Sequence, residues 1–417
     1  MKIDKEKLSN GLTIYFYEDH RRHSTFFQFV TLFGGASKDF KVDGIEYHFD
    51  DGIAHILEHY VVEENEYGNF LRTLGERQMT TNAATYNDMT RFYFEAVEDL
   101  EYGIETLIKG IYSPVFEEAR LKKVKEPIYQ EIRGRSGNKF YHSNQVTLNN
   151  LLNEIKFRSI GGTLQEVENT DLETLKLCYE AFYQPTNQFI VVGGNFDKES
   201  VLDLIKNVYK EINYTTHKVE KTELKEKKEV VKKYEDVIFP TGEEYVEVSY
   251  KIDVSKFTIK ERLKLDFYLN CFYEMFFGVS SPLYNELVSD KIITTSMACG
   301  DSQLDKFLLM SIGSYSNELK VLEKSIKDTI KEMNSFDEEL FDLWKKDTIL
   351  NVILREEKLL DVIMPFVFNV ATFNYPYLDT KEDIEAFNFL EFKEMISSLD
   401  FNNFTVTTIK IKKQLST

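Results

Sequence analysis

Two histidines and a glutamate lie within five positions of one another near the start of the chain. They end the stretch GIAHILEH, which runs from Gly52 to His59 and contains His55 and Glu58. Residues four apart share one face of a helix, so a helix here would aim both imidazoles at one point. Imidazole nitrogens bind Zn²⁺ at about 2.0–2.1 Å, and Glu58 could accept a proton from a water molecule at that point. The spacing therefore predicts a metal site with a general base beside it.

The order His-x-x-Glu-His is the reverse of the commoner His-Glu-x-x-His and is typical of inverted-motif zinc metallopeptidases. A catalytic zinc takes three protein ligands and leaves a fourth position for water. Asp and Glu together number 70, so candidates for the third ligand abound and spacing alone does not choose among them. The alternative interpretation is a helix surface that carries two solvated histidines.

The segments around the motif alternate between strand-like and helix-like patterns. Residues 12–17, 25–33 and 90–97 have the composition of strands, and apolar spacings of three and four indicate helices from residue 100 onward. The second half repeats the order of strands, helices and a closing strand. This order predicts an α+β protein of two similar domains, each a mostly antiparallel sheet with helices packed on one face.

A change of composition separates the two halves. Residues 215–235 are highly charged and contain few large apolar side chains, as a linker or an exposed strand would. We predict a zinc-binding peptidase domain over 1–218, a charged linker over 219–235 and a second domain of similar plan over 236–417.

Composition narrows the class of protein. The 417 residues, 42% of them hydrophobic, are enough for two or three domains with a large core. The formal net charge of −19 opposes nucleic-acid binding, which needs a basic face. The three cysteines are far apart, which argues against a disulfide framework and suits a reducing compartment. Without a long apolar run or an apolar leader, we expect no membrane span and a cytoplasmic protein.

The motif and its surroundings resemble the pitrilysin/insulinase family of zinc metallopeptidases, in the branch of the bacterial processing peptidases and the mitochondrial processing peptidase. The segments that carry the resemblance follow one another in the family's order. They are similar to its opening hairpin, zinc helix, Asn-Ala-x-Thr segment, third-ligand helix and closing strand: LSNGLTIYF (8–16), DDGIAHILEHYVVEE (50–64), NAATYNDMTRFYFEA (82–96), KEPIYQEIRGR (125–135) and YEAFYQPTNQFIVVGGNFD (179–197). The match is specific in the first half and looser in the second.

The resemblance implies a role for each residue of the metal site. His55 and His59 would be zinc ligands, Glu131 would be the third ligand, and Glu58 would be the general base. One Zn²⁺ per chain is then expected. The separation of 72 positions between His59 and Glu131 is somewhat shorter than is common in the family.

The resemblance also implies a way of binding substrate. Asn82 and Ala83 would lie on a strand that holds an extended peptide through main-chain hydrogen bonds. The alternative for Asn82 is a turn residue, since asparagine favours turns.

The chain departs from the family pattern at several positions. The family often has a second glutamate seven residues before the third ligand, where this chain has Val124, and Pro127 should kink the third-ligand helix. In the second half, members that complete the active site carry an arginine and a tyrosine that bind the substrate carbonyl. The corresponding positions here are Val288 and Thr295, which supply neither a charge nor a phenol.

We therefore expect a zinc-dependent endopeptidase that cleaves peptides or unfolded segments. In this interpretation it is the zinc-bearing subunit of a heterodimer, and a homologous sister subunit supplies the arginine and tyrosine. A homodimer that uses other donors is the alternative arrangement. The competing function is a non-catalytic or weakly active peptide-binding or regulatory subunit with a vestigial zinc site.

Overall fold

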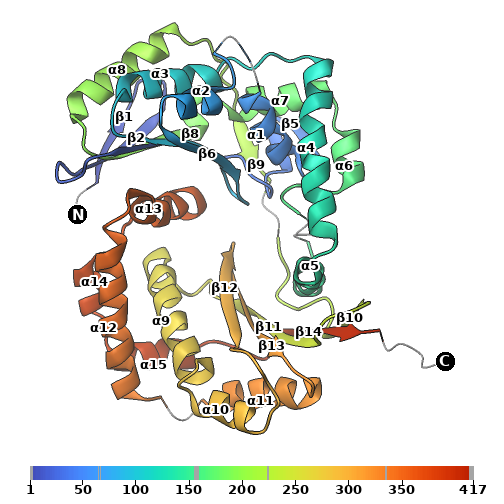
Figure 1. The fold of residues 1–417 in the computed structure, drawn as a ribbon. Coiled ribbons are helices and arrows are strands. Elements are labelled where there is room, and N and C mark those ends of the chain that lie inside the picture. Colours follow the sequence, from blue (N-terminus) through green and yellow to red (C-terminus); the bar gives the residue numbers. More distant parts are fainter. Residues whose placement is uncertain are drawn as a thin grey trace. The chain divides into compact units, whose positions relative to one another are not determined.

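The computed structural model describes residues 3–63, 65, 67–154, 159–222, 225–333 and 336–412 (Figure 1). These residues form two compact units, and each unit draws on three separate stretches of chain. The first unit comprises Met1–Arg135, Arg158–Glu223 and Arg355–Leu378; the second comprises Ser136–Phe157, Leu224–Leu354 and Asp379–Thr417. The predicted division at residues 219–235 follows chain order rather than this packing, and positions 223 and 224 within it lie outside the described residues.

The first unit is built on a six-stranded sheet. In spatial order its strands are β1 (Asp4–Lys7), β2 (Thr13–Glu18), β8 (Gln188–Gly194), β3 (Thr25–Thr31), β7 (Thr90–Ala96) and β6 (Thr80–Thr85). The β2–β8 pair is parallel and the other pairs are antiparallel. Strand β6 is therefore an edge strand. A second sheet has the order β5 (Ile45–His48), β4 (Asp39–Val42) and β9 (Val219–Lys221).

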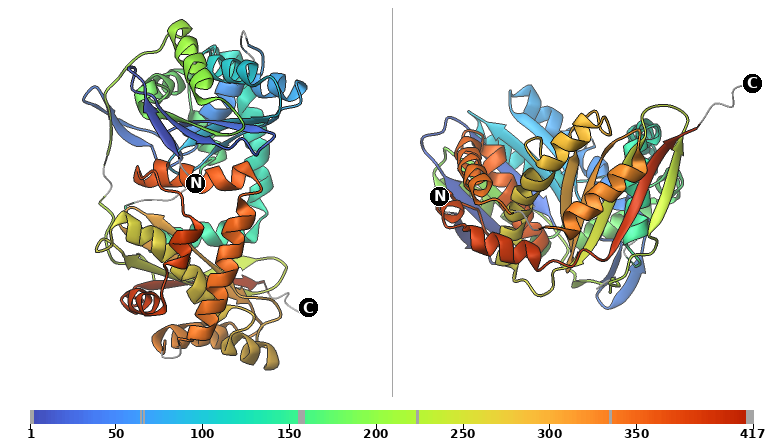
Figure 2. Two further views of the ribbon diagram at one scale, coloured as in Figure 1. Left: turned by 90° about the vertical axis from the view of Figure 1, so that its left-hand side faces the viewer. Right: turned by 90° about the horizontal axis from the view of Figure 1, so that it is seen from below.

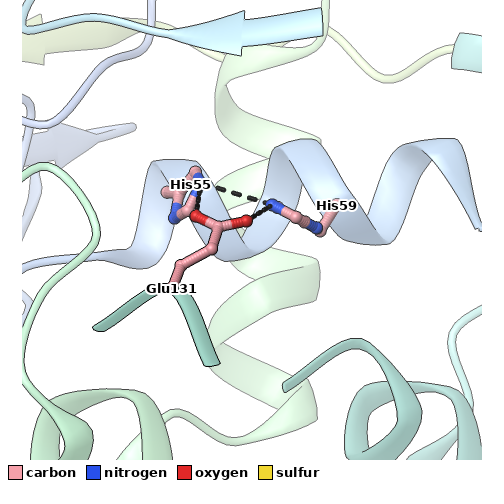
Figure 3. Close-up of side chains that lie close together, drawn as sticks. All are labelled: His55, His59 and Glu131. Carbon is pink, nitrogen blue, oxygen red and sulfur yellow. Dashed lines mark hydrogen bonds and ion pairs between the residues drawn. The ribbon is translucent and has the colours of Figure 1, made fainter. Parts of the chain in front are cut away.

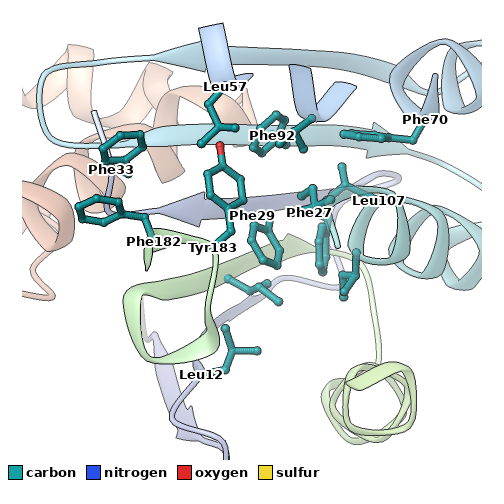
Figure 4. Close-up of a cluster of buried hydrophobic side chains, with 14 of the residues drawn as sticks. Leu12, Phe27, Phe29, Phe33, Leu57, Phe70, Phe92, Leu107, Phe182 and Tyr183 are labelled. Carbon is teal, nitrogen blue, oxygen red and sulfur yellow. The ribbon is translucent and has the colours of Figure 1, made fainter. Parts of the chain in front are cut away.

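Both faces of the six-stranded sheet are covered by helices. Phe27, Phe29 and Phe92 point to one face and pack under helices α1, α3 and α8 (Figure 4). Tyr15 and Phe26 share a core with residues of α13 on the other face. Helix α13 lies along that face, against β3 and β8 (Figures 1 and 2). Burial on two faces explains why every residue of β3 and β8 is buried. The helices of this unit are α1 (Ile53–Val62), α2 (Phe70–Glu76), α3 (Leu100–Ile111), α4 (Glu118–Ser136), α6 (Leu164–Asn169), α7 (Leu172–Phe182), α8 (Lys198–Glu211), α13 (Leu359–Phe373) and the 3₁₀ turn η1 (Pro185–Asn187).

The second unit repeats this plan. Its strands, in spatial order, are β10 (Tyr234–Phe239), β14 (Phe404–Ile411), β11 (Tyr245–Asp253), β13 (Phe307–Tyr315) and β12 (Ala298–Leu304), and the β10–β14 pair alone is parallel among them. Helices α9 and α11 share a core with the sheet, and α5 lies against β14 and β10. The helices are α5 (Lys139–Leu151), α9 (Ile259–Phe277), α10 (Pro282–Ser289), α11 (Leu319–Lys331), α12 (Glu338–Arg355), α14 (Lys381–Glu385) and α15 (Phe389–Ser397).

The predicted class, α+β with two mostly antiparallel sheets, is confirmed. The structure adds α13, a helix from late in the chain that covers the second face of the first sheet. Within the described ranges, no helix is both long enough and apolar enough to cross a bilayer.

The prediction that the charged segment is solvent-exposed is wrong for Glu226. Its side chain is fully buried and forms an ion pair of 2.5 Å with the equally buried Lys251. Its carboxylate also accepts the backbone N–H groups of Asn153 and Glu154, each at 2.9 Å. Composition could not reveal this burial, because it depends on a lysine 25 positions away on strand β11.

Candidate metal centre

Helix α1 turns one face to the core and carries two of the predicted metal ligands, His55 and His59, on another face. Ile53, Ile56 and Leu57 are buried in the core of the first unit. His55 and His59 lie four residues apart, so they share the opposite face. The amphipathic spacing of this short helix therefore fixes the direction of both imidazoles.

Helix α4 carries Glu131 to the same place. Leu121, Val124 and Ile128 are its buried residues, and they anchor the helix in the core. The helix continues through Pro127. Glu131 lies one turn beyond Ile128 and is partly exposed, as a group that meets a ligand should be.

The three side chains converge (Figure 3). Nε2 of His55 and Nε2 of His59 are 3.3 Å apart, and the two oxygens of Glu131 lie 3.5 Å from the first and 3.6 Å from the second. Zinc bonds of 2.0–2.2 Å in a tetrahedral arrangement place ligand atoms about 3.3–3.6 Å apart. Two imidazoles and a carboxylate at these separations fit the protein ligands of a catalytic zinc site.

Burial keeps the two histidines in the form that binds metal. It lowers the pKa of His55 to about 3, and His59 and Arg135 add to the effect. Burial also lowers the pKa of His59, while Glu131 opposes that shift. Neutral imidazole is the form with a free nitrogen lone pair. Both side chains can therefore act as ligands at neutral pH without losing a proton first.

The residues that surround the predicted metal ligands differ from the family pattern. Val124, at the position of the family's second glutamate, is buried in the core. Nδ1 of His55 is buried, and within the described part of the chain it has no hydrogen-bond partner. Arg135, one turn after Glu131, instead places its Nη2 3.5 Å from the Glu131 carboxylate. A ligating histidine is usually oriented by a hydrogen bond from its second ring nitrogen to a carboxylate or a carbonyl oxygen. Val124 cannot provide such a carboxylate.

Glu58 lies on the same helix as His55 and His59 and is nearly inaccessible to water. Its side chain is buried, and Thr85 donates a hydrogen bond of 2.5 Å to its Oε2. Burial raises the pKa of Glu58 to about 7; Thr85 opposes the shift and Glu131 adds to it. A carboxyl group with a pKa near 7 can exchange a proton with water in either direction at neutral pH.

Asn82 and Ala83 lie on the edge strand β6, paired with Tyr93 and Phe92 of β7. Asn82 is in a strand and not in a turn. Its Oδ1 accepts the N–H of Ala83 at 2.9 Å. The free edge of β6 thus has backbone groups that an extended peptide could meet.

Three features of the site escaped the sequence analysis. Thr85 belongs to the Asn-Ala-x-Thr segment, and that pattern was the available signal for it. Arg135 lies four residues after Glu131, a spacing that signals an ion pair on a helix. Gly52 and Gly161 approach each other closely, and the pair of glycines at positions 161 and 162 was the available signal for this contact.

The two positions of the missing donors lie in the second unit. Val288 is exposed on α10. The hydroxyl of Thr295 lies 3.4 Å from that of Ser314. Neither side chain carries the positive charge or the phenol that the family pattern has there.

Comparison with known families assigns both halves of the chain. Residues 46–161 match the family model described as insulinase (peptidase family M16), and residues 169–348 match the one described as peptidase M16 inactive domain. The first match includes His55, Glu58, His59 and Glu131. The chain belongs to the M16, or pitrilysin/insulinase, family.

Relatives in the M16 family support this assignment. The zinc protease YmfH of Bacillus subtilis is 27% identical over 329 residues, which are 78% of this chain and 77% of the relative. The crystal structure of an M16-like peptidase from Alicyclobacillus acidocaldarius superposes with a TM-score of 0.89 at 20% identity, over 99% of this chain and 98% of that one. The periplasmic protease PqqL of Escherichia coli superposes with a TM-score of 0.75 at 15% identity. The superposition covers 99% of this chain and 48% of the PqqL chain.

Proposed function

We propose that this M16 chain is a zinc-dependent endopeptidase. His55, His59 and Glu131 would hold one zinc ion per chain, and Glu58 would be the general base. The observation that carries the proposal is the convergence of three side chains: the Nε2 atoms of His55 and His59 are 3.3 Å apart, and each lies 3.5–3.6 Å from one oxygen of Glu131. The buried carboxyl group of Glu58 lies between the two histidines on the same helix. Relatives named zinc proteases agree with this chemistry.

Glu58 performs the proton transfers of the proposed reaction. Zinc, when bound, polarises the scissile carbonyl and acidifies water. Thr85 fixes Oε2 of Glu58, and the carboxylate takes a proton from the attacking water as the new C–O bond forms. The same carboxyl group then gives that proton to the departing amine as the C–N bond breaks.

The free edge of β6 is the proposed binding surface for the substrate. Asn82 and Ala83 would pair with the main chain of an extended peptide, which adds a strand to the sheet. Only a peptide or an unfolded segment can present an extended main chain in this way. The recognition would depend on backbone more than on side chains.

A sister subunit is part of the proposal. Val288 and Thr295 supply no donor for the developing oxyanion, and such donors are commonly worth about 10²-fold or more in rate. PqqL, with about twice the length of this chain, has a first half that superposes on it as well. A homologous partner chain that brings an arginine and a tyrosine would complete the site; a homodimer is the other arrangement. The processing-peptidase branch and a cytoplasmic location stay predictions.

The competing function is a weakly active or non-catalytic peptide-binding subunit. Val124 and the unpartnered Nδ1 of His55 within the described residues favour it. The intact cluster of ligands and the buried Glu58 favour the peptidase.

Cleavage by a Glu58→Gln variant separates the two functions. The zinc-loaded protein is incubated with a library of peptides from a digested proteome, alone and with any co-purifying homologous chain, and products are identified by mass spectrometry. We expect cleavage by the wild type and a loss of at least about 100-fold in Glu58→Gln with zinc retained. Equal cleavage by both proteins would overturn the role of Glu58.

A further inference from the structure

Thr85 occupies the last position of the edge strand β6, beside the turn that leads into β7. Its strand partner is Thr90, the first residue of β7. The Thr85 hydroxyl lies 2.5 Å from Oε2 of Glu58 and 3.3 Å from the hydroxyl of Thr90. Thr85 thus links β6, the proposed peptide-binding strand, to Glu58, the proposed base, by a hydrogen bond.

Counting protons shows which way the Thr85 hydroxyl points. A threonine hydroxyl has one proton to donate. Thr90 is buried and gives its proton to the carbonyl oxygen of Phe33 at 2.8 Å. Thr90 therefore accepts but cannot donate to Thr85, and the proton of Thr85 goes to the nearer oxygen, Oε2 of Glu58. A distance of 2.5 Å is typical of an O–H group that donates to a carboxylate.

We propose that Thr85 is a positioning residue that holds the Glu58 carboxylate in register with a peptide bound on β6. The inference rests on the proposed peptidase function. Ala83 and Thr85 are two positions apart, so they share one face of β6. A peptide paired with the main chain of Asn82 and Ala83 would lie on residues 82–85 of β6. The Glu58 carboxylate is hydrogen-bonded to Thr85 of the same four residues.

This link explains why a hydroxyl is needed at position 85. Glu58 has several rotatable bonds, and helix α1 alone sets only the position of its backbone. One short hydrogen bond from a strand that is itself paired along its length to β7 removes this freedom. Misplacement of a reacting group by about 1 Å can cost about 10²-fold in rate. Valine has the shape of threonine without the hydroxyl, so it keeps the strand and loses the link.

The test compares Thr85→Val with Thr85→Ser. Thr25→Val is the matched control, because Thr25 lies on β3, outside the proposed binding surface, and donates instead to the carbonyl oxygen of Asn195 at 2.6 Å. Three quantities are measured for each zinc-loaded protein: zinc per chain, kcat and KM for a peptide that the wild type cleaves, and the position of the Glu58 carboxylate in a crystal structure.

We expect Thr85→Val to keep its zinc and its KM, to lose about 10- to 100-fold in kcat, and to show a displaced Glu58. Thr85→Ser should restore kcat and the carboxylate position, and Thr25→Val should resemble the wild type. An unmoved carboxylate in Thr85→Val, or a kcat no lower than that of Thr25→Val, would overturn the inference. If the wild type cleaves no peptide, the proposed function fails, and the Glu58 positions in the Thr85→Val and Thr85→Ser crystals still decide the role of Thr85.

Discussion

The backbone of Gly52 lies directly against the backbone of Gly161. A Cβ atom added to Gly52 would stand 2.9 Å from the Gly161 carbonyl oxygen, and one added to Gly161 would stand 3.3 Å from Nδ1 of His55. Gly52 is also the residue before α1 and has a φ of 93°. The start of α1, which carries His55 and His59, is therefore set by a close contact that only glycine allows.

Gly52→Ala should destabilise the protein and weaken zinc binding. Gly44→Ala is the matched control, because Gly44 has a φ of 87° and no atom within 4 Å of an added Cβ. Both variants carry the cost of a left-handed alanine, about 1 kcal/mol, and Gly52→Ala adds the steric clash. Urea unfolding and zinc titration of both variants measure the difference. Equal stability and equal zinc affinity would show that the contact is not tight.

Glu58→Gln should stabilise the metal-free protein in a pH-dependent way. The pKa of Glu58 is raised from 4.5 to about 7 in the folded state. Below pH 4.5 the group is protonated in both states and costs nothing. Between 4.5 and 7 the unfolded chain loses the proton first, so folding stability falls as pH rises, and the full cost is present above 7.

The variant removes this cost, since glutamine cannot ionise. We expect Glu58→Gln to exceed the wild type by up to about 3 kcal/mol at pH 8, from the size of the shift, and by little at pH 4.5. Denaturant unfolding of both metal-free proteins at the two pH values measures the difference. A gain at pH 4.5 as large as at pH 8 would show that burial of the charge is not its cause.

Lys251→Met should be strongly destabilising. It leaves the Glu226 carboxylate buried without its cation, a change that typically costs about 3–5 kcal/mol. The double variant Lys251→Met/Glu226→Gln removes both charges and should recover part of the loss. Lys218→Met breaks the exposed pair with Glu220 and should change stability by less than about 1 kcal/mol. If urea unfolding showed the same small loss of unfolding free energy for Lys251→Met as for Lys218→Met, the burial of the Lys251–Glu226 pair would be contradicted.

Local patterns predicted local structure well. Residues at i and i+4 share one face of a helix, which is why the shared face of His55 and His59 on α1 could be predicted from the sequence. Glu131 lies 72 positions from His59 on another helix, and only packing brings the two together; resemblance to the family found it, and periodicity could not. The burial of Glu226 and the α13 covering of the first sheet depend on tertiary contacts, which leave no local trace.

Val124→Glu tests whether the family's second glutamate can be restored. Val124 packs in the core of the first unit and is nearly inaccessible. A carboxyl group there would be buried without a cation, so we expect a loss of stability of a few kcal/mol, about 2–4, and no tighter zinc binding. Differential scanning calorimetry and a zinc titration check both statements. Stronger zinc binding by the variant would show that the site still accommodates the family's arrangement.

The zinc content of the purified chain tests the central claim most directly. Elemental analysis is carried out on the wild type, on His59→Ala and on His20→Ala, in which an exposed histidine far along the chain from the motif is removed. We expect about one zinc per chain in the wild type and in His20→Ala, and none in His59→Ala. A wild type that takes up no zinc, or a His59→Ala variant that keeps it, would contradict the assignment of His55, His59 and Glu131 as the metal centre.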